Sequence, residues 1–500
     1  MFLIFRPSST KSLHINDFPP EIMREIFRHC PSPDSPAPST RNAPLNIAAV
    51  CGSWRDLVLK MPEIWAIIGI RVRGSVPDVG GITQYWTNIA GDHPLSLTFH
   101  LLGQTIHMKL KDMLPLETFT LISHAQSLHL RMDVADQRFL FNHIPKDIGL
   151  PFLKSLTLVV NSGEDRAHIM WVGRPSLLRS CPSLRHLTIE MLPTLSTVMP
   201  LDQGITVDVP WTQLTSLTIK EPRLVLTRAV EILALCPNLV ECELGTGCGR
   251  GAASWTTKAV VLARLTSLAL AAKCQQGHDA RPGVTLILDC LTLPALKTLS
   301  VSAGWTPRAA LAACLLSFQQ RSEFALEEFS VMGNIDLEGL RTFLETTPTL
   351  ESLSVNPVNQ SVYPPLLRLL EPETAETRQL LLPNLISLKL TAHAPGIYVN
   401  TSGTAKYMEK KWHTRAQAVD KYRCEMEVRS DRLVCMLRSR FRGTGLPRIQ
   451  GMKQLEGVTL RTWLGGNTYA VDEWMRCVGL GQIEELERRG LFVKFEFEVY

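Results

Sequence analysis

The residues that could do chemistry in this 500-residue chain begin with a glycine-rich stretch at residues 245–252. Gly247, Gly249 and Ala252 satisfy the pattern G-x-G-x-x-A, which lets a backbone approach the pyrophosphate of a dinucleotide after a strand. The same pattern requires an acidic residue about 20 positions later to bind the ribose. No Asp or Glu occurs between residues 251 and 278. The stretch therefore favours a loop that leaves a strand over a cofactor site.

Cysteine and histidine are the other candidates, as metal ligands or nucleophiles. Among the 12 cysteines, Cys236, Cys242 and Cys248 are evenly spaced, but no CxxC pair occurs and no zinc signature has that interval. The chain also lacks a G-x-x-x-x-G-K-S/T loop, an H-E-x-x-H helix and a G-x-S-x-G elbow. We therefore predict no catalytic residue, no metal and no cofactor, and we expect scattered, reduced thiols.

What recurs instead is a six-residue phrase, in which an apolar anchor is followed by two variable residues, an apolar residue, one variable residue and an apolar residue. The phrase occupies residues 153–158, 184–189, 214–219, 239–244, 265–270, 296–301, 326–331, 350–355, 385–390 and 455–460. Up to Leu385 the anchors lie 24 to 35 residues apart. This interval is close to the period of leucine-rich repeats, roughly 20–29 residues.

The spacing within the phrase predicts a strand, because side chains of a strand alternate between its two faces. The apolar residues would point inward, and small polar residues such as Thr157 and Ser300 would face solvent or a ligand. Helical segments at about residues 227–235 and 306–320 lie between phrases. The repeats therefore predict a curved parallel sheet with helices outside, although polar residues of this kind do not identify a ligand.

The period is interrupted between residues 396 and 447. Basic residues gather there before a predicted helix that runs through Arg442: Lys406, Lys410, Lys411, Arg415, Lys421 and Arg423. We interpret this part as a basic helical insertion or one long repeat, with a solvated basic face as the simplest explanation of its charge. The phrase resumes at Leu455, and the alternating residues 493–499 predict a final strand that closes the stack.

A different pattern is found near the beginning of the chain. Asp17 can cap a helix that begins at two prolines and ends near Cys30, before the Pro/Ser/Asp-rich loop at residues 31–44. The apolar residues of this helix fall on one face at helical spacing: Ile22, Met23, Ile26 and Phe27. A second apolar helix is predicted at residues 45–59, and a third short element at residues 62–65.

The ordered set of these residues resembles the F-box of fungal F-box-like proteins, whose pattern is L-P-x-E-I, I-F, V-C-x-x-W-R and P-x-L-W. The matching segments are residues 18–22, 26–27, 50–51, 54–55 and 62–65. Phe18 replaces the first Leu and Ile64 the last, and both changes keep the apolar character. The loop at residues 31–44 is longer than in compact F-boxes.

The resemblance implies a three-helix module that binds a Skp-type adaptor and, through it, a cullin scaffold. A module this small cannot bury all of its apolar side chains, so a partner would cover the remainder. The residues expected at that contact are Pro19, Ile22, Ile26, Val50 and Trp54. The alternative is that these five side chains only form the core of a small helical bundle.

The fold class expected from both patterns is α/β, with a small N-terminal helical F-box-like module followed by a leucine-rich-repeat solenoid. The expected domains are a tail (1–12), the F-box-like module (13–70), a connector (71–94), the solenoid (95–395), the basic insertion (396–447), and final repeats with a C-terminal cap (448–500).

Composition limits the kinds of partner. A net charge of +5 is small for this length, so we expect no nucleic-acid partner. The longest apolar stretch, residues 259–272, is interrupted by Arg264 and is shorter than the roughly 20 residues that a membrane span needs, so we expect no membrane partner. Together with the scattered cysteines, these features favour a cytoplasmic or nuclear protein.

The leading functional hypothesis is therefore a substrate-recognition adaptor of a Skp-cullin-F-box ubiquitin ligase, which holds the adaptor through the F-box and an unknown protein substrate on the repeat face. The alternative is a leucine-rich-repeat scaffold whose degenerate F-box has no ligase role. A third class, a repeat-based enzyme or cofactor binder, lacks any supporting motif. We thus expect a non-catalytic protein.

Overall fold

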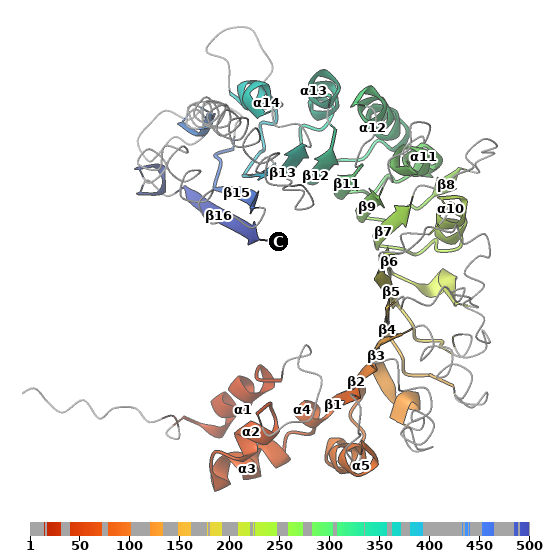
Figure 1. Cartoon of the computed structure of the whole chain (residues 1–500), viewed down its shortest axis with the longest axis vertical. Helices are drawn as coiled ribbons and strands as arrows, with labels where there is room; N and C mark the ends of the chain where they lie inside the picture. Colours follow the sequence, from red (N-terminus) through yellow and green to blue (C-terminus); the bar gives the residue numbers. More distant parts are fainter. Residues whose placement is uncertain are drawn as a thin grey trace, which may run out of the picture. The chain divides into compact units, whose positions relative to one another are not determined.

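The computed structural model forms two compact units, and each has an α/β architecture built on a parallel sheet (Figure 1). Unit 1 comprises Met1–Ser196 and Ile205–Gln213, and unit 2 comprises Thr197–Gly204 and Leu214–Tyr500. The structure describes residues 15, 18–31, 41–72, 79–101, 121–133, 149–161, 178, 181–192, 209–220, 224, 226–247, 259–273, 283–303, 308–334, 336–357, 363–371, 381–393, 433, 436–438, 440, 453–464, 485–488 and 491–499. The expected tail at 1–12 and most of 396–447 lie outside these residues.

Four short helices open unit 1: α1 (Pro20–Arg28), α2 (Leu45–Ala48), α3 (Gly52–Leu59) and α4 (Pro62–Trp65). The first and last lie where the sequence predicts them. The prediction of one helix over 45–59 is wrong, because Cys51 has an extended backbone (φ −159°, ψ 171°) that separates α2 from α3. Asp17, the predicted cap, lies outside the described residues. Pro19 holds the N-cap position and makes no side-chain hydrogen bond. Pro20 follows at the first helical position, and because proline has no N–H, one donor that would need a cap is absent.

The small core of these helices is aromatic. The ring of Phe27 lies 4.9 Å from that of Trp54. Trp65 is 1% exposed, and its indole N–H donates to the carbonyl of Val58 at 3.0 Å. The rings of Trp65 and of Trp86 in α5 (Val79–Ala90) also form a T-shaped pair, with centroids 5.2 Å apart. The helices are therefore joined to the rest of unit 1 by buried aromatic contacts rather than by a loose linker.

The sheet of unit 1 begins directly after α4, earlier than the phrases indicate. Its strands are β1 (Ile67–Val72), β2 (Leu95–Leu101), β3 (Ala125–Asp133), β4 (Ser155–Asn161) and β5 (His186–Leu192). They pair in that order and all in parallel. A short 3-10 helix, η2 (Trp211–Gln213), also belongs to this unit.

Unit 2 alternates strands and helices along the chain. Its elements are β6 (Ser216–Lys220), α10 (Leu226–Ala234), β7 (Glu241–Gly247), β8 (Val260–Val261), β9 (Ser267–Lys273), α11 (Gly283–Cys290), β10 (Leu291–Thr292), β11 (Thr298–Ser302), α12 (Arg308–Ser322), β12 (Glu328–Gly333), α13 (Leu337–Glu345), β13 (Ser352–Pro357), α14 (Tyr363–Leu370), β14 (Ser387–His393), β15 (Gly457–Leu464) and β16 (Phe492–Val499). Strands β6, β7, β9 and β11–β16 pair in that order in parallel, while β8 pairs with β10. Helices α10 to α14 each pack against the next, and Figure 1 shows them along one side of these strands.

Every predicted phrase forms a strand, and its anchor leucine lies in the turn before that strand. These anchors are at most 1% exposed: Leu153, Leu184, Leu214, Leu239, Leu265, Leu296, Leu326, Leu350, Leu385 and Leu455. The turn around Leu265 shows how an anchor sets the register. The N–H of Leu265 donates to the carbonyl of Leu262, and the next N–H, of Thr266, donates to Val240 beside β7 at 2.8 Å. The predicted helices at 227–235 and 306–320 correspond to α10 and α12.

One buried cation joins two segments of unit 2. Arg440 is 2% exposed, and its guanidinium donates to the backbone carbonyls of Leu370 (2.5 Å), Leu381 (2.5 Å) and Leu382 (3.0 Å). Leu370 ends α14, and the other two residues precede β14. Leu382 has a positive φ of 54°, which is uncommon for a side chain of this size. Arg440 therefore holds a helix end and a left-handed turn together.

Candidate protein-binding surface on the N-terminal helices

Helix α1 has two apolar stripes rather than the one that the sequence predicts. Met23 and Phe27 are buried at 4% and 1% exposure, whereas Ile22 and Ile26 are 48% and 42% exposed. Residues four apart lie on the same face of a helix, so each pair forms its own stripe. The first stripe builds the core, and the second remains at the surface.

The other three predicted contact residues differ in exposure. Pro19, the N-cap residue of α1, is exposed. Val50 is 60% exposed in the connection between α2 and α3. Trp54 is half-buried, since its ring packs on Phe27. Four of the five predicted residues are thus at the surface, and Trp54 has a role in the core as well.

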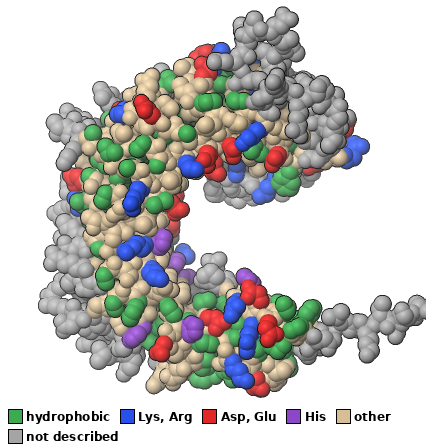
Figure 2. All heavy atoms as spheres, turned by 180° about the vertical axis from the view of Figure 1, so that it is seen from behind, with side chains coloured by type: hydrophobic (Ala, Val, Ile, Leu, Met, Phe, Trp, Pro, Cys, Tyr) green, Lys and Arg blue, Asp and Glu red, His purple; other side chains and the backbone are tan. Residues whose placement is uncertain are grey.

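The sequence interpretation missed further exposed apolar side chains near these residues. Ile15 and Phe18, which precede α1, are 43% and 41% exposed, and Leu59 at the end of α3 is 40% exposed. Figure 2 shows hydrophobic side chains at the surface of the N-terminal helices beside charged ones. Their apolar type is the only signal in the sequence, because exposure depends on how the helices pack.

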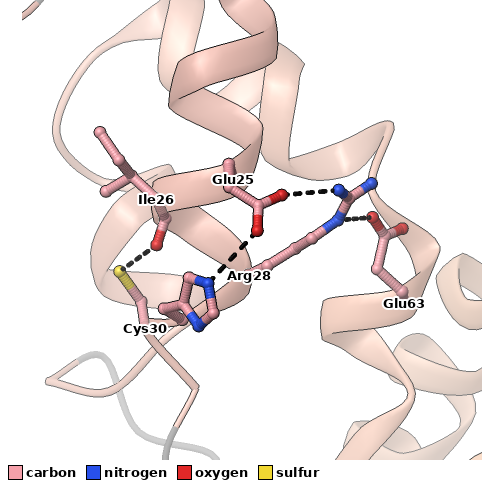
Figure 3. A network of polar contacts seen from close by, with 6 residues as sticks. Glu25, Ile26, Arg28, Cys30 and Glu63 are labelled. Atoms are coloured by element: carbon pink, nitrogen blue, oxygen red, sulfur yellow. Dashed lines mark hydrogen bonds and ion pairs between the residues drawn. The ribbon is translucent and has the colours of Figure 1, made fainter.

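A charged network fixes α1 on α4 and thereby sets the direction of the exposed stripe (Figure 3). Arg28 donates through Nε to Glu63 at 3.1 Å and through Nη1 to Glu25 at 2.9 Å. The hydrogen bond from Arg28 lowers the pKa of the Glu25 carboxyl below its usual range. His29 Nε2 lies 3.3 Å from the second oxygen of Glu25. The partners are exposed, so the network orients the helix more than it stabilises the fold.

Cys51 lies between the exposed Val50 and α3. It is the N-cap residue of α3, and its Sγ lies 3.1 Å from the hydroxyl of Ser53. The hydrogen bond with Ser53, followed by that from the backbone N–H of Trp54, lowers the pKa of the Cys51 thiol. Burial has the opposite effect on Cys181 and Cys236, where it raises the pKa to about 12. Cys51 is therefore much the more reactive of these thiols.

The glycine-rich stretch and the evenly spaced cysteines form no cofactor or metal site in the described part of the chain. Gly245 and Gly247 belong to β7, and a Cβ on Gly245 would lie 3.3 Å from the Cα of Lys220. This close approach of β6 explains a small residue there without a cofactor. Gly249, Ala252 and Cys248 lie outside the described residues. Among the residues that the structure describes, no cluster of His, Cys, Asp or Glu could hold a metal ion, and no described helix is long and apolar enough to span a membrane.

In the comparisons with known proteins, no family model matches the chain, and no curated protein matches it.

Proposed function

We propose that this chain is a substrate-recruiting adaptor of a Skp-cullin-F-box ubiquitin ligase. In this proposal the N-terminal helices are an F-box-like module, and the sheets that follow belong to a leucine-rich-repeat solenoid that binds a protein substrate. The observation that carries the proposal is the second stripe of α1. Ile22 and Ile26 are exposed although buried aromatic residues already complete the core of the same helices.

The exposed stripe supports a partner because of its energetic cost. An apolar side chain of this size gains about 1.5–3 kcal/mol when it moves fully out of water. Ile22, Ile26 and Val50 forgo much of that gain, and so do Ile15 and Phe18. The buried side chains of Met23 and Phe27 hold α1 in place before any partner arrives. A helical partner that covers this surface would recover the gain without rearranging the module.

The repeat proposal is supported by the anchors and by the strand pattern. Ten buried leucines each precede a strand, and apart from the short strands β8 and β10 the strands within each unit pair in parallel in chain order. A single strand-and-helix unit cannot bury its apolar face alone, so such units stack. The outward residues of the sheet are available for a substrate, because they are not needed in the core.

The test is direct binding of a purified Skp-type adaptor to the full chain by isothermal titration calorimetry. The variant Ile22→Asp/Ile26→Asp places two charges on the exposed stripe. Because both positions are exposed to water, the charges should not disturb the core. We expect it to weaken adaptor binding by roughly 100-fold or more, since burying an unpaired charge costs several kcal/mol. The matched control is Leu235→Asp, at an apolar residue of unit 2 that is 45% exposed.

The outcomes separate the two hypotheses. The ligase role is supported if the wild type and Leu235→Asp bind the adaptor and the double variant Ile22→Asp/Ile26→Asp does not. Unchanged binding in the double variant would show that the adaptor uses another surface. If the wild type does not bind the adaptor at all, the ligase proposal is abandoned in favour of a protein-binding scaffold.

A further inference from the structure

The outward face of the sheet in unit 1 carries a cluster of basic and hydroxyl side chains. On β2 the residues Leu97 and Phe99 are buried, so the alternate residues Thr98 and His100 face outward. On β3, Leu128 and Leu130 are buried, and His129 and Arg131 face outward in the same way. Figure 2 shows histidine beside Lys and Arg side chains along this part of the chain.

Parallel pairing brings these side chains together. His100 is in register with Arg131, and Thr98 with His129, so each pair is separated by about 4.8 Å, the usual spacing of strands. The rings of His100 and His129 lie 5.8 Å apart. Thr157 of β4 is in register with His129 on its other side. Two imidazoles, a guanidinium and two hydroxyls thus share one small area.

In the described part of the chain, one donor of the Arg131 guanidinium lacks a partner. Its Nε is buried and has no hydrogen-bond partner among the described residues. Its register neighbours are His100 and Val159, and neither can accept a charge-assisted bond as a carboxylate would. The nearest acids on this face are Asp133, two residues along β3, and Glu190 beyond Val159 on β5. No described ion pair joins either acid to Arg131.

The chemistry of this area suits an anion. A guanidinium offers a planar set of N–H donors that fits the oxygens of a phosphate or carboxylate, and the two imidazole rings lie next to it on the same face. A metal cation is disfavoured because Arg131 would repel it. Nucleic acid is disfavoured because the described outward face has few fixed cations and no Phe, Tyr or Trp side chain on which a base could stack.

We propose that the outward face of β2–β5 binds an extended protein segment that carries an oxyanion, a phosphate monoester or a carboxylate, through Arg131, His100 and His129. The row Ser96, Ser127 and Ser155 lies beside this cluster and offers further hydroxyls. The four strands span roughly 15 Å, which an extended segment of about five residues can cross. Only one part of this inference rests on the proposed function, namely that the bound segment belongs to a substrate of the ligase.

The test uses the full chain and fluorescently labelled pentapeptides with the sequence Gly-Ser-X-Ser-Gly, in which X is phosphoserine, glutamate or serine. Binding is measured by fluorescence anisotropy, with inorganic phosphate as a competitor. We expect the phosphoserine or glutamate peptide to bind at least about tenfold more tightly than the serine peptide. Arg131→Gln should remove that preference, and His129→Gln should reduce it, while both variants keep the melting temperature of the wild type.

Arg341→Gln is the matched control, because Arg341 is an arginine on α13 whose side chain is 43% exposed and pairs with Glu345. It should bind as the wild type does. Equal binding of the three peptides, or an equal effect of Arg341→Gln and Arg131→Gln, would overturn the proposal. Tighter binding of a labelled single-stranded oligonucleotide than of any peptide would also overturn it. If Arg131→Gln unfolds, the proposal is judged by the other two results: His129→Gln must reduce the preference for the charged peptides, and inorganic phosphate must compete with them. None of these measurements requires the Skp-type adaptor, so failure here is distinct from failure of adaptor binding.

Discussion

The buried guanidinium of Arg440 gives the sharpest stability prediction. The replacement Arg440→Ala removes three hydrogen bonds, to Leu370, Leu381 and Leu382. It removes the side-chain donor from the carbonyls of Leu370 and Leu381, and it leaves the carbonyl of Leu382 with only the backbone N–H of Leu385 at 3.3 Å. It also removes the bond that holds the left-handed backbone of Leu382.

The magnitude follows from two opposing effects. Hydrogen bonds that involve a charged group contribute about 1.5–3 kcal/mol each. Against this, burial lowers the pKa of Arg440 from 12.5 to about 10, which corresponds to a cost of about 3 kcal/mol for the charged form. Three hydrogen bonds exceed that cost, and truncation leaves a cavity as well. We expect Arg440→Ala to lower the free energy of unfolding by about 3–5 kcal/mol.

The assay is urea denaturation followed by circular dichroism, with Arg438→Ala as the matched control because Arg438 is exposed two residues away. The control should change the free energy of unfolding by less than about 0.5 kcal/mol. The pKa of about 10 lies well above neutrality, so Arg440 stays charged and the loss should be equal at pH 6 and pH 8. Equal stability of the two variants would refute the claim that Arg440 joins α14 to the turn before β14.

Two further predictions concern packing and reactivity. Gly339→Ala should destabilise unit 2 by about 1–3 kcal/mol, because the new Cβ would lie 2.2 Å from that of Ala312. The added change Ala312→Gly should recover part of the loss in the same urea assay. A single variant as stable as the wild type would contradict the close packing of α12 on α13. Iodoacetamide at pH 7 should label Cys51 faster than Cys181 and Cys236, because its pKa is lowered while theirs are raised to about 12. The labelling rate of Cys51, measured by peptide mass spectrometry, should rise with pH through a midpoint below the ordinary thiol value, and equal labelling of Cys181 would contradict it.

The strands were predictable wherever a leucine anchor precedes them. Alternation and the anchor act locally, so the ten phrases are visible in the sequence without knowledge of the neighbours. Strand β3 was not predicted from the sequence, because Ala125, buried at 0% exposure, stands where the phrase has its anchor leucine. Strand β2 was not predicted, because Pro94 stands three residues before Leu97, where the phrase has its anchor leucine.

The exposure of the candidate surface was not predictable. Helical spacing places Ile22 beside Met23 and Ile26 beside Phe27, and only the packing of Trp54 against Phe27 decides which pair is buried. The break at Cys51 has a similar origin, since Val50 and Cys51 fit a continuous helix by type. Arg440 likewise resembles an ordinary surface cation in sequence, and its burial depends on segments far along the chain.

The register of β14 and β15 has a consequence for how such a chain can change over time. Residues 387–393 pair one for one with residues 457–463, although the connection between them is far longer than that between β12 and β13. Each strand is aligned by its own anchor turn, so the length of a connection does not enter the alignment. The entropy of closing a loop also grows only slowly with its length. New sequence can therefore enter between strands without disturbing those already in place, and a foreign segment grafted there should leave the neighbouring strands in their present alignment.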